Sequence, residues 1–212
     1  MHDNIRNILA RITALEDELR DAIAEQQVHF RFRIEGTRVR FEEGMRETHR
    51  QLKVGLLTWL RRARLRNIAT APVIYVLIVP LALLDFCVSV FQRLCFPVYG
   101  MPLVRRGRYV VIDRHQLRYL NSIERLNCVY CGYGNGVLAY AREVAARTEQ
   151  YWCPIKHAYQ VLDPHRRYMT FADFGDAEAY SETVRRLRAE LAAELRTNGE
   201  EPPASGPTCV PR

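Results

Sequence analysis

Lysine is almost missing from this chain of 212 residues. Of its 31 basic residues, only Lys53 and Lys156 are lysine and the rest are arginine, a skew that genomic base composition explains as well as phosphate binding does. The formal net charge of +7 would suit a nucleic-acid binder. However, the arginines are spread along the chain and interleaved with acids, and an anionic membrane surface explains the sign equally well. We therefore do not expect nucleic acid as a partner.

The chain also lacks the companion motifs that two short matches would need. Residues 132 to 136, GYGNG, look like a phosphate-binding loop, but no strand directly precedes them and no Lys-Ser/Thr follows. The DFG at residues 173 to 175 has no glycine-rich loop or catalytic-loop motif beside it. These absences exclude P-loop and protein-kinase chemistry. The chain does not open with a secretory signal peptide, so we expect a reducing compartment.

Charge is scarcest between Arg66 and Arg93, where Asp85 is the one charged residue among 26. Each Val, Leu, Ile or Phe favours insertion by about 0.3–0.6 kcal/mol, but a central Asp costs roughly 3 kcal/mol, so a simple transmembrane helix is marginal. Arginines flank the segment on both sides, whereas a spanning segment has one flank rich in basic residues and one flank poor in them. We predict a hydrophobic hairpin over residues 67 to 98, kinked at Pro80, re-entrant or interfacial, with both ends cytoplasmic. A single kinked span and a buried soluble helix remain open.

Four potential metal ligands fall into two close pairs. Cys128 and Cys131 form a C-x-x-C pair, and Cys153 and His157 form a C-x3-H pair about twenty residues later. Two such pairs are typical of a tetrahedral zinc site, with the glycines of residues 132 to 136 supplying the positive dihedrals of a knuckle. The spacing predicts a closed structural zinc site. An iron–sulfur cluster is the alternative metal, and a redox thiol pair or ordinary core cysteines are the alternatives without metal.

Three further ionisable residues are candidates for function. Asp85 lies inside the apolar segment, where an ionisable residue is a functional candidate by default, although we favour a helix cap or a pair with a neighbouring arginine. Asp113 and His115 lie just before the cysteines. Either could hydrogen-bond a metal-ligating side chain and so orient it. A plain helix cap by Asp113 is the preferred interpretation.

Residues 1 to 66 have the patterns of amphipathic helices and one β-hairpin. Over residues 4 to 26 apolar side chains recur at helical spacing, which suits packing on this chain or a coiled coil with another. Residues 27 to 42 alternate apolar and basic residues around Glu35-Gly36-Thr37, which favours a hairpin over one helix broken at Gly36.

Residues 99 to 197 form the predicted metal-binding domain. It has a short strand at Tyr109–Ile112 and helices over residues 137 to 149 and 177 to 196. Residues 198 to 212 have the composition of a disordered tail.

Three segments resemble a family of uncharacterised bacterial membrane-associated proteins: CFPVYGMP, YLNSIERLNCVYC and RTEQYWCPIKHA. The resemblance covers residues 67 to 160, implies a bacterial membrane protein and carries no activity. We therefore expect a mainly α protein with a minor β element, attached to the cytoplasmic face of a bacterial inner membrane. A structural zinc site is expected to hold its C-terminal domain together. Its expected function is a scaffold or adaptor for a protein partner or a second copy of the chain. The alternative is a membrane-proximal metalloenzyme or iron–sulfur redox protein.

Overall fold

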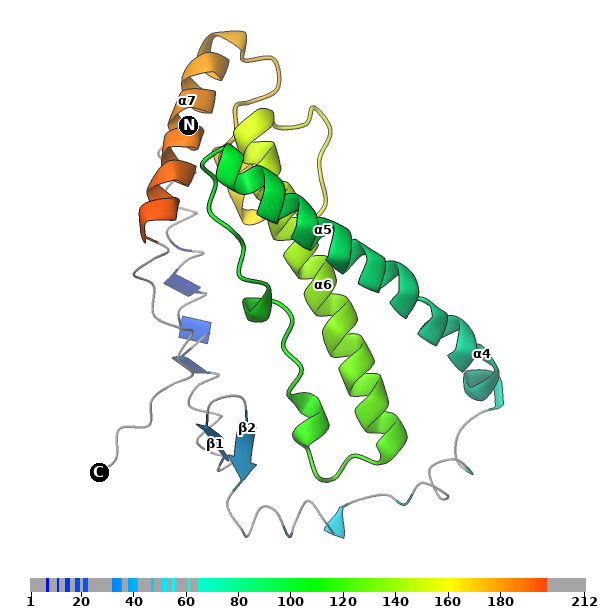
Figure 1. Ribbon diagram of the computed structural model, residues 1–212. Coiled ribbons are helices and arrows are strands. Elements are labelled where there is room, and N and C mark those ends of the chain that lie inside the picture. The colour runs from blue at the N-terminus through cyan, green and yellow to red at the C-terminus, as the bar shows by residue number, and fades with distance from the viewer. Residues whose placement is uncertain are drawn as a thin grey trace, which may run out of the picture. The chain divides into compact units, whose positions relative to one another are not determined.

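The computed structural model describes residues 65 to 197 without a gap, together with residues 32–35, 38–41 and isolated positions before residue 65 (Figure 1). The described part is mainly helical. Its contacts divide the chain into two units. One unit comprises Met1–Leu60, Asp113–Arg125 and Ser205–Arg212, and the other comprises Arg61–Ile112 and Leu126–Ala204.

The first unit contains a two-stranded antiparallel hairpin in the predicted place. β1 (Phe32–Glu35) pairs with β2 (Arg38–Phe41), and the register sets Phe32 opposite Phe41 and Arg33 opposite Arg40. The amphipathic helix predicted over residues 4 to 26 is described only at isolated helical positions, so its packing and the coiled coil lie outside the described residues.

The apolar segment is one bent helix, and the predicted hairpin is wrong. α4 (Leu65–Val76) and α5 (Ile78–Val98) are separated only by Leu77, whose backbone stays right-handed helical (φ −60°, ψ −16°), and the two helices continue in one direction (Figure 1). Pro80 has no N–H to donate to the carbonyl of Val76, which explains why the ladder breaks at Leu77 without reversing the chain. Ile68–Val98 is long and apolar enough to cross a membrane, and only 11% of its most apolar stretch is buried. That exposure argues against the buried soluble helix.

α6 (Ser122–Trp152) is far longer than the helix predicted at residues 137 to 149. A reciprocal capping box starts it: the Asn121 side-chain oxygen accepts from the Glu124 N–H, and the Glu124 carboxylate accepts from the Asn121 N–H, both at 2.9 Å. The three glycines of residues 132 to 136 lie inside this helix. Within the described residues only Gly100 and Gly175 are glycines with positive φ, so the predicted knuckle is wrong.

α4 and α5 pack side by side with α6 in parallel, because the contacts of Tyr75 in α4 and of Tyr99, which follows α5, keep the same order along α6. The ring centroids of Tyr75 and Tyr130 are 5.7 Å apart near the start, and those of Tyr99 and Tyr151 are 5.3 Å apart near the end. Between these aromatic pairs the helices share a core with the chain that follows α5 and with α7. The buried members of this core are Phe96, Met101, Val104, Tyr140, Val144 and Leu191.

Residues 99 to 112, which we call the crossover, leave the end of α5 and run back beside α6 (Figure 1). They contain the short helix η1 (Arg106–Arg108). The predicted strand at Tyr109–Ile112 is wrong, because the Val110 N–H donates to the Arg106 carbonyl in a turn, at 3.0 Å. A Cβ at Gly136 would lie 2.7 Å from both the Tyr109 carbonyl oxygen and the Val110 Cα. The glycine therefore lets the crossover backbone touch α6.

The C-terminal helix is confirmed almost as predicted, as α7 (Ala177–Thr197). The Asp176 carboxylate caps it by accepting from the Ala179 N–H at 3.0 Å. The short helix η3 (Arg166–Thr170) packs under α7, where Tyr168, Phe171 and Leu187 form a second buried cluster. The predicted tail at residues 198 to 212 lies outside the described residues.

Candidate functional site

The four predicted metal ligands lie near opposite ends of α6. Cys128 and Cys131 are on the helix itself, and Cys153 follows its last residue, Trp152. At 1.5 Å per residue, the helix separates Cys128 from Trp152 by about 36 Å. In the part of the chain that the structure describes, no three His, Cys, Asp or Glu side chains lie close enough together to hold a metal. The fold therefore does not bring the predicted Cys3His set together, because no turn interrupts the helix at the glycines.

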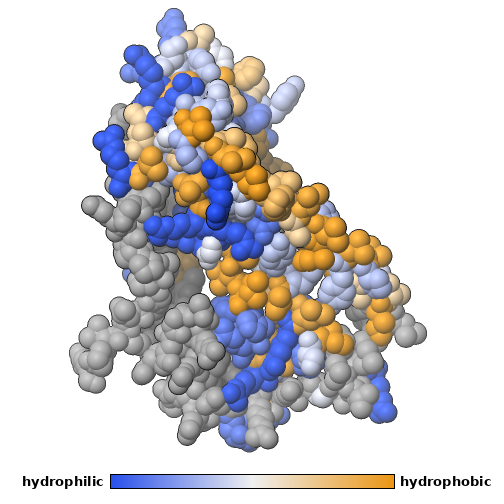
Figure 2. All heavy atoms as spheres, in the orientation of Figure 1, coloured by the Kyte–Doolittle hydropathy of each residue, from blue (hydrophilic) through white to orange (hydrophobic). Residues whose placement is uncertain are grey.

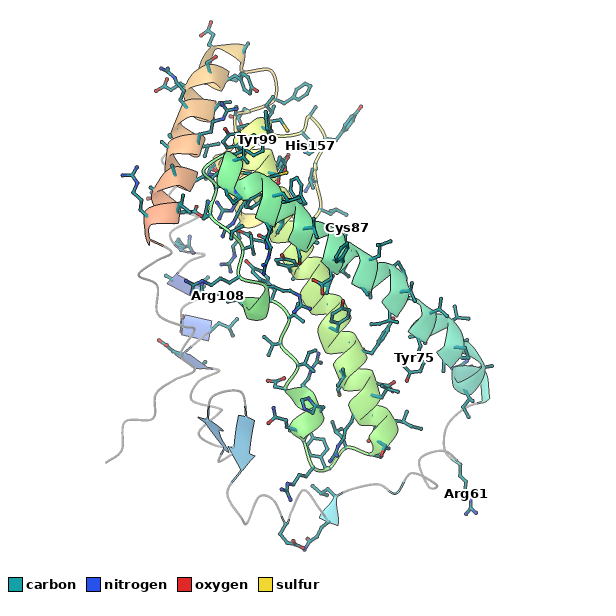
Figure 3. All side chains as sticks on the ribbon, viewed as in Figure 1. Arg61, Tyr75, Cys87, Tyr99, Arg108 and His157 are labelled. Carbon is teal, nitrogen blue, oxygen red and sulfur yellow. The ribbon has the colours of Figure 1, made fainter. Side chains whose placement is uncertain are left out.

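The second predicted pair lies in the loop that follows α6. Cys153 is exposed. His157 lies in this loop (Figure 3). It is held by Tyr168 of η3: its backbone N–H donates to the Tyr168 hydroxyl at 2.6 Å, and the two rings stack with centroids 5.7 Å apart. Lys156 hydrogen-bonds Ala172 through its backbone and forms a salt bridge with Asp173 at 2.8 Å. These contacts indicate that His157 fastens the loop to η3.

Asp85 is the centre of a polar contact between α5, α6 and the crossover. It is 9% exposed, and Arg106 donates to both of its carboxylate oxygens, at 2.8 Å from Nε and 2.7 Å from Nη2. The Tyr133 hydroxyl of α6 donates to the same carboxylate at 3.0 Å. The arginine that pairs with Asp85 is therefore supplied from 21 residues further along the chain.

The same face of α5 carries two more polar side chains, one and two helical turns further on. The Ser89 hydroxyl lies 3.2 Å from that of Tyr140, and the Gln92 amide donates to the Tyr140 hydroxyl. Gln92 also meets the crossover, because its side-chain oxygen accepts from the Val104 N–H at 2.9 Å. We call Asp85, Ser89 and Gln92 the polar stripe of α5.

The electrostatics of the polar stripe suit a fixed contact. The Asp85 carboxylate raises the pKa of Arg106 through their hydrogen bonds, and burial together with the bond to Asp85 raises the pKa of Tyr133. Both groups therefore keep their protons at neutral pH. The Ser89 hydroxyl lies beside that of Tyr140, and its hydrogen bond to the Asp85 carboxylate, after those of Arg106 and Tyr133, helps to lower the pKa of Asp85. These contacts hold α5, α6 and the crossover together.

A second network joins α6, η3 and α7 through Arg167. Its guanidinium donates to Glu194 at 2.9 and 3.0 Å, to Glu143 at 3.1 and 3.2 Å, and to Gln150 at 2.7 Å. Burial alone would lower the pKa of Arg167, but the hydrogen bonds and charges of Glu194 and Glu143 outweigh it and the pKa is raised. His165 contacts Glu149 beside this network, at 2.9 Å. The network is a partly buried clamp that holds η3 and α7 on α6.

Asp113 and His115 belong to the first unit, where both are exposed. Asp113 precedes the short helix η2 (Arg114–Gln116), but its side chain makes no capping hydrogen bond, so the preferred helix cap is wrong. Sequence reasoning missed Arg106, Tyr133 and Arg167. A signal for the first two was present, since polar residues at 85, 89 and 92 mark one face of an otherwise apolar helix.

Comparison with known proteins does not assign the chain to a family. The chain matches no protein-family model, and no curated protein or solved structure is significantly similar to it. The resemblance to bacterial membrane-associated proteins therefore stays a prediction.

Proposed function

We propose that the chain is a non-enzymatic scaffold or adaptor that is attached to a membrane through the outer face of α4 and α5. The observation that carries this proposal is a row of exposed apolar side chains on the side of the helix away from α6. Leu83, Phe86 and Leu94 are 62%, 66% and 67% exposed, and Figure 2 shows hydrophobic residues gathered along this helix. We call this face the free face; its members are Val76, Val79, Leu83, Phe86, Val90, Leu94 and Val98.

An exposed apolar surface of this length on a soluble monomer marks a membrane or protein interface. The polar side chains that could do chemistry on α5 are instead turned inward and engaged by α6 and the crossover. This division of faces supports an anchoring function. Following the basic flanks of the segment, we propose the cytoplasmic face of a bacterial inner membrane as the location, with a protein partner for the remaining surface. No contact among the described residues favours the metalloenzyme or iron–sulfur alternative.

Membrane fractionation of expressed protein tests the proposal. The double variant Leu83→Ser, Phe86→Ser removes two free-face side chains, each of which contributes about 1.5–3 kcal/mol when fully buried, so partitioning should fall by at least a hundredfold. Leu195→Ser is the matched control, because Leu195 is an exposed apolar residue of α7. The control should stay in the membrane fraction with the unaltered protein. Recovery of the unaltered protein in the soluble fraction would refute membrane attachment.

The alternative function has its own test. Anaerobically purified protein should be analysed for metal content and visible absorbance. Stoichiometric iron with absorbance in the visible range would replace the adaptor proposal with the redox alternative.

A further inference from the structure

The position of Arg106 shows how the apolar helix can meet a bilayer. Arg106 pairs with Asp85, which lies near the middle of Ile68–Val98. Its neighbours Arg105, Gly107 and Arg108 are exposed, and Figure 3 shows Arg108 on the crossover that runs beside α6. The crossover is thus fixed at the mid-length of the helix, and not at one of its ends.

This placement is incompatible with a helix that stands along the bilayer normal as a single copy. The 31 residues of Ile68–Val98 would measure about 46 Å, against a hydrocarbon core of about 30 Å, so residue 85 would lie near the middle of the core. The crossover would then carry exposed arginines and irregular backbone at that depth. Exposed irregular backbone does not occur against lipid tails, where nothing satisfies its polar groups, and charged side chains are costly at that depth.

The two faces of the helix differ in the way that an in-plane orientation needs. On the free face, exposed Val76, Leu83 and Leu94 follow one another at helical spacing, with Arg93 as the one charged residue at its edge. The opposite face carries the polar stripe and is covered by α6 and the crossover. A helix of this kind lies in the interface with its apolar face among the acyl chains.

Charge complementarity indicates which lipid the face meets. Exposed Arg66 lies in the first turn of α4, and exposed Arg93 is the one basic residue of α5. Asp85 is the one acid on either helix, and it is buried against Arg106. Within α4 and α5 the rim of the free face therefore carries arginines and no exposed acid, which suits anionic headgroups.

Taking membrane attachment from the proposed function, we propose that α4 and α5 lie in the plane of one leaflet of an anionic bilayer. The free face is inserted among the acyl chains, and the crossover and α6 stay on the aqueous side. The chain is then monotopic: it does not span the membrane, although its helix is long enough to do so.

Depth measurements with a cysteine-attached fluorophore test the orientation. Single-cysteine variants of the full chain would carry the probe on the free face at native Cys87, at Val76→Cys or at Leu94→Cys, with the other cysteines replaced. From residue 76 to residue 94 the helix advances about 27 Å. Lipids with nitroxide groups at different depths should quench all three probes to the same, shallow extent. A span would instead make the probe at residue 87 much deeper than the other two.

Gly107→Cys supplies the decisive position on the crossover, because a Cβ there has no heavy atom within 4 Å and the label should leave the fold intact. In-plane binding predicts that this probe is quenched by aqueous iodide and not by lipid nitroxides. Protection from iodide together with deep lipid quenching would overturn the in-plane orientation but leave membrane attachment standing. An absence of lipid quenching at every position would refute the proposed function as well, and would assign the free face to a protein partner or a second copy.

The lipid class is tested by binding to vesicles of phosphatidylcholine, with and without phosphatidylglycerol. We expect tighter binding to the anionic vesicles, with the preference lost at high salt. Arg66→Gln with Arg93→Gln should reduce that preference by roughly fivefold for each arginine. The variant Arg185→Gln, Arg196→Gln removes the same charge from α7 and should leave the preference nearly unchanged. Equal binding to both vesicle types, or an equal loss in both double variants, would refute a lipid contact at the rim.

Discussion

Replacing Gly136 by alanine should destabilise the protein, although it places a better helix former inside a helix. A new Cβ would lie 2.7 Å from the carbonyl oxygen of Tyr109 and 2.7 Å from the Cα of Val110. Both are backbone atoms, which cannot rotate away as a side chain can. The substitution therefore tests the packing of the crossover on α6, on which the depth of Arg106 in a membrane depends.

The magnitude follows from two opposing terms. Alanine is favoured over glycine in a helix interior by about 1 kcal/mol. Overpacking costs about 1–3 kcal/mol, and contact with fixed backbone belongs at the upper end of that range. The net expectation is a loss of about 1–2 kcal/mol. Since each kcal/mol shifts the melting temperature of a chain of this size by about 2–4 °C, the midpoint should fall by about 2–8 °C.

Gly134 provides the matched control on the same helix. A Cβ there would lie 3.2 Å from Cδ1 of Leu81, the end of a side chain that can move by a few tenths of an ångström. Gly134→Ala should therefore be neutral or stabilise by up to about 1 kcal/mol. Thermal and urea unfolding of both variants, followed by circular dichroism in the same detergent, measures the difference. If Gly136→Ala stabilises the protein as much as Gly134→Ala does, the crossover does not lie on α6 and the in-plane argument loses its basis.

Three further outcomes are expected in urea unfolding. Arg167→Gln leaves the Glu143 and Glu194 carboxylates without their partly buried partner and should cost about 1.5–3 kcal/mol, whereas Glu190→Gln in the exposed pair with Arg186 should cost less than about 1 kcal/mol; similar losses would show that Arg167 is not a clamp. Tyr133→Phe removes a hydrogen bond to the Asp85 carboxylate and should cost about 1.5–3 kcal/mol, and a neutral result would contradict that bond. Cys131→Ser changes an exposed helical residue and should stay within about 0.5 kcal/mol with unchanged metal content; loss of a stoichiometric metal would restore the metal site.

The sequence identified the apolar segment but not its shape. Pro80 was a correct sign of a bend, because its missing N–H breaks the helical ladder whatever surrounds it. A hairpin needs more than a missing bond. It needs residues that can reverse the chain, such as glycine with positive φ, and residues 73 to 90 contain none. The absence of a turn signal beside Pro80 favoured one bent helix over two antiparallel arms.

The predicted metal site depended on a turn at the glycines that follow Cys131. That turn was wrong, because a glycine-rich run can also belong to a helix. A run such as Gly132-Tyr133-Gly134-Asn135-Gly136 suits a turn, and it also suits a helix that other backbone must approach closely. Only tertiary contacts decide between these uses, and here Leu81 and the crossover occupy the space that a Cβ would fill. A helical signal did run through the glycines: Tyr133, Val137, Tyr140 and Val144 recur at spacings of four, three and four.

Asp85 shows how the two faces of one helix can differ in their cost of contact with lipid. As a central charge in the segment it counted as a cost of roughly 3 kcal/mol, which made insertion marginal. That cost applies only if the carboxylate faces lipid. In the structure it faces α6 and is bonded by Arg106 and Tyr133. In the proposed orientation only the free face meets lipid, and that face carries no charge between Val76 and Leu94 other than Arg93 at its edge. Insertion of one face can therefore be favourable where insertion of the whole helix is not, and this difference between the faces is the physical basis of the in-plane anchor that we propose for a helix long enough to span.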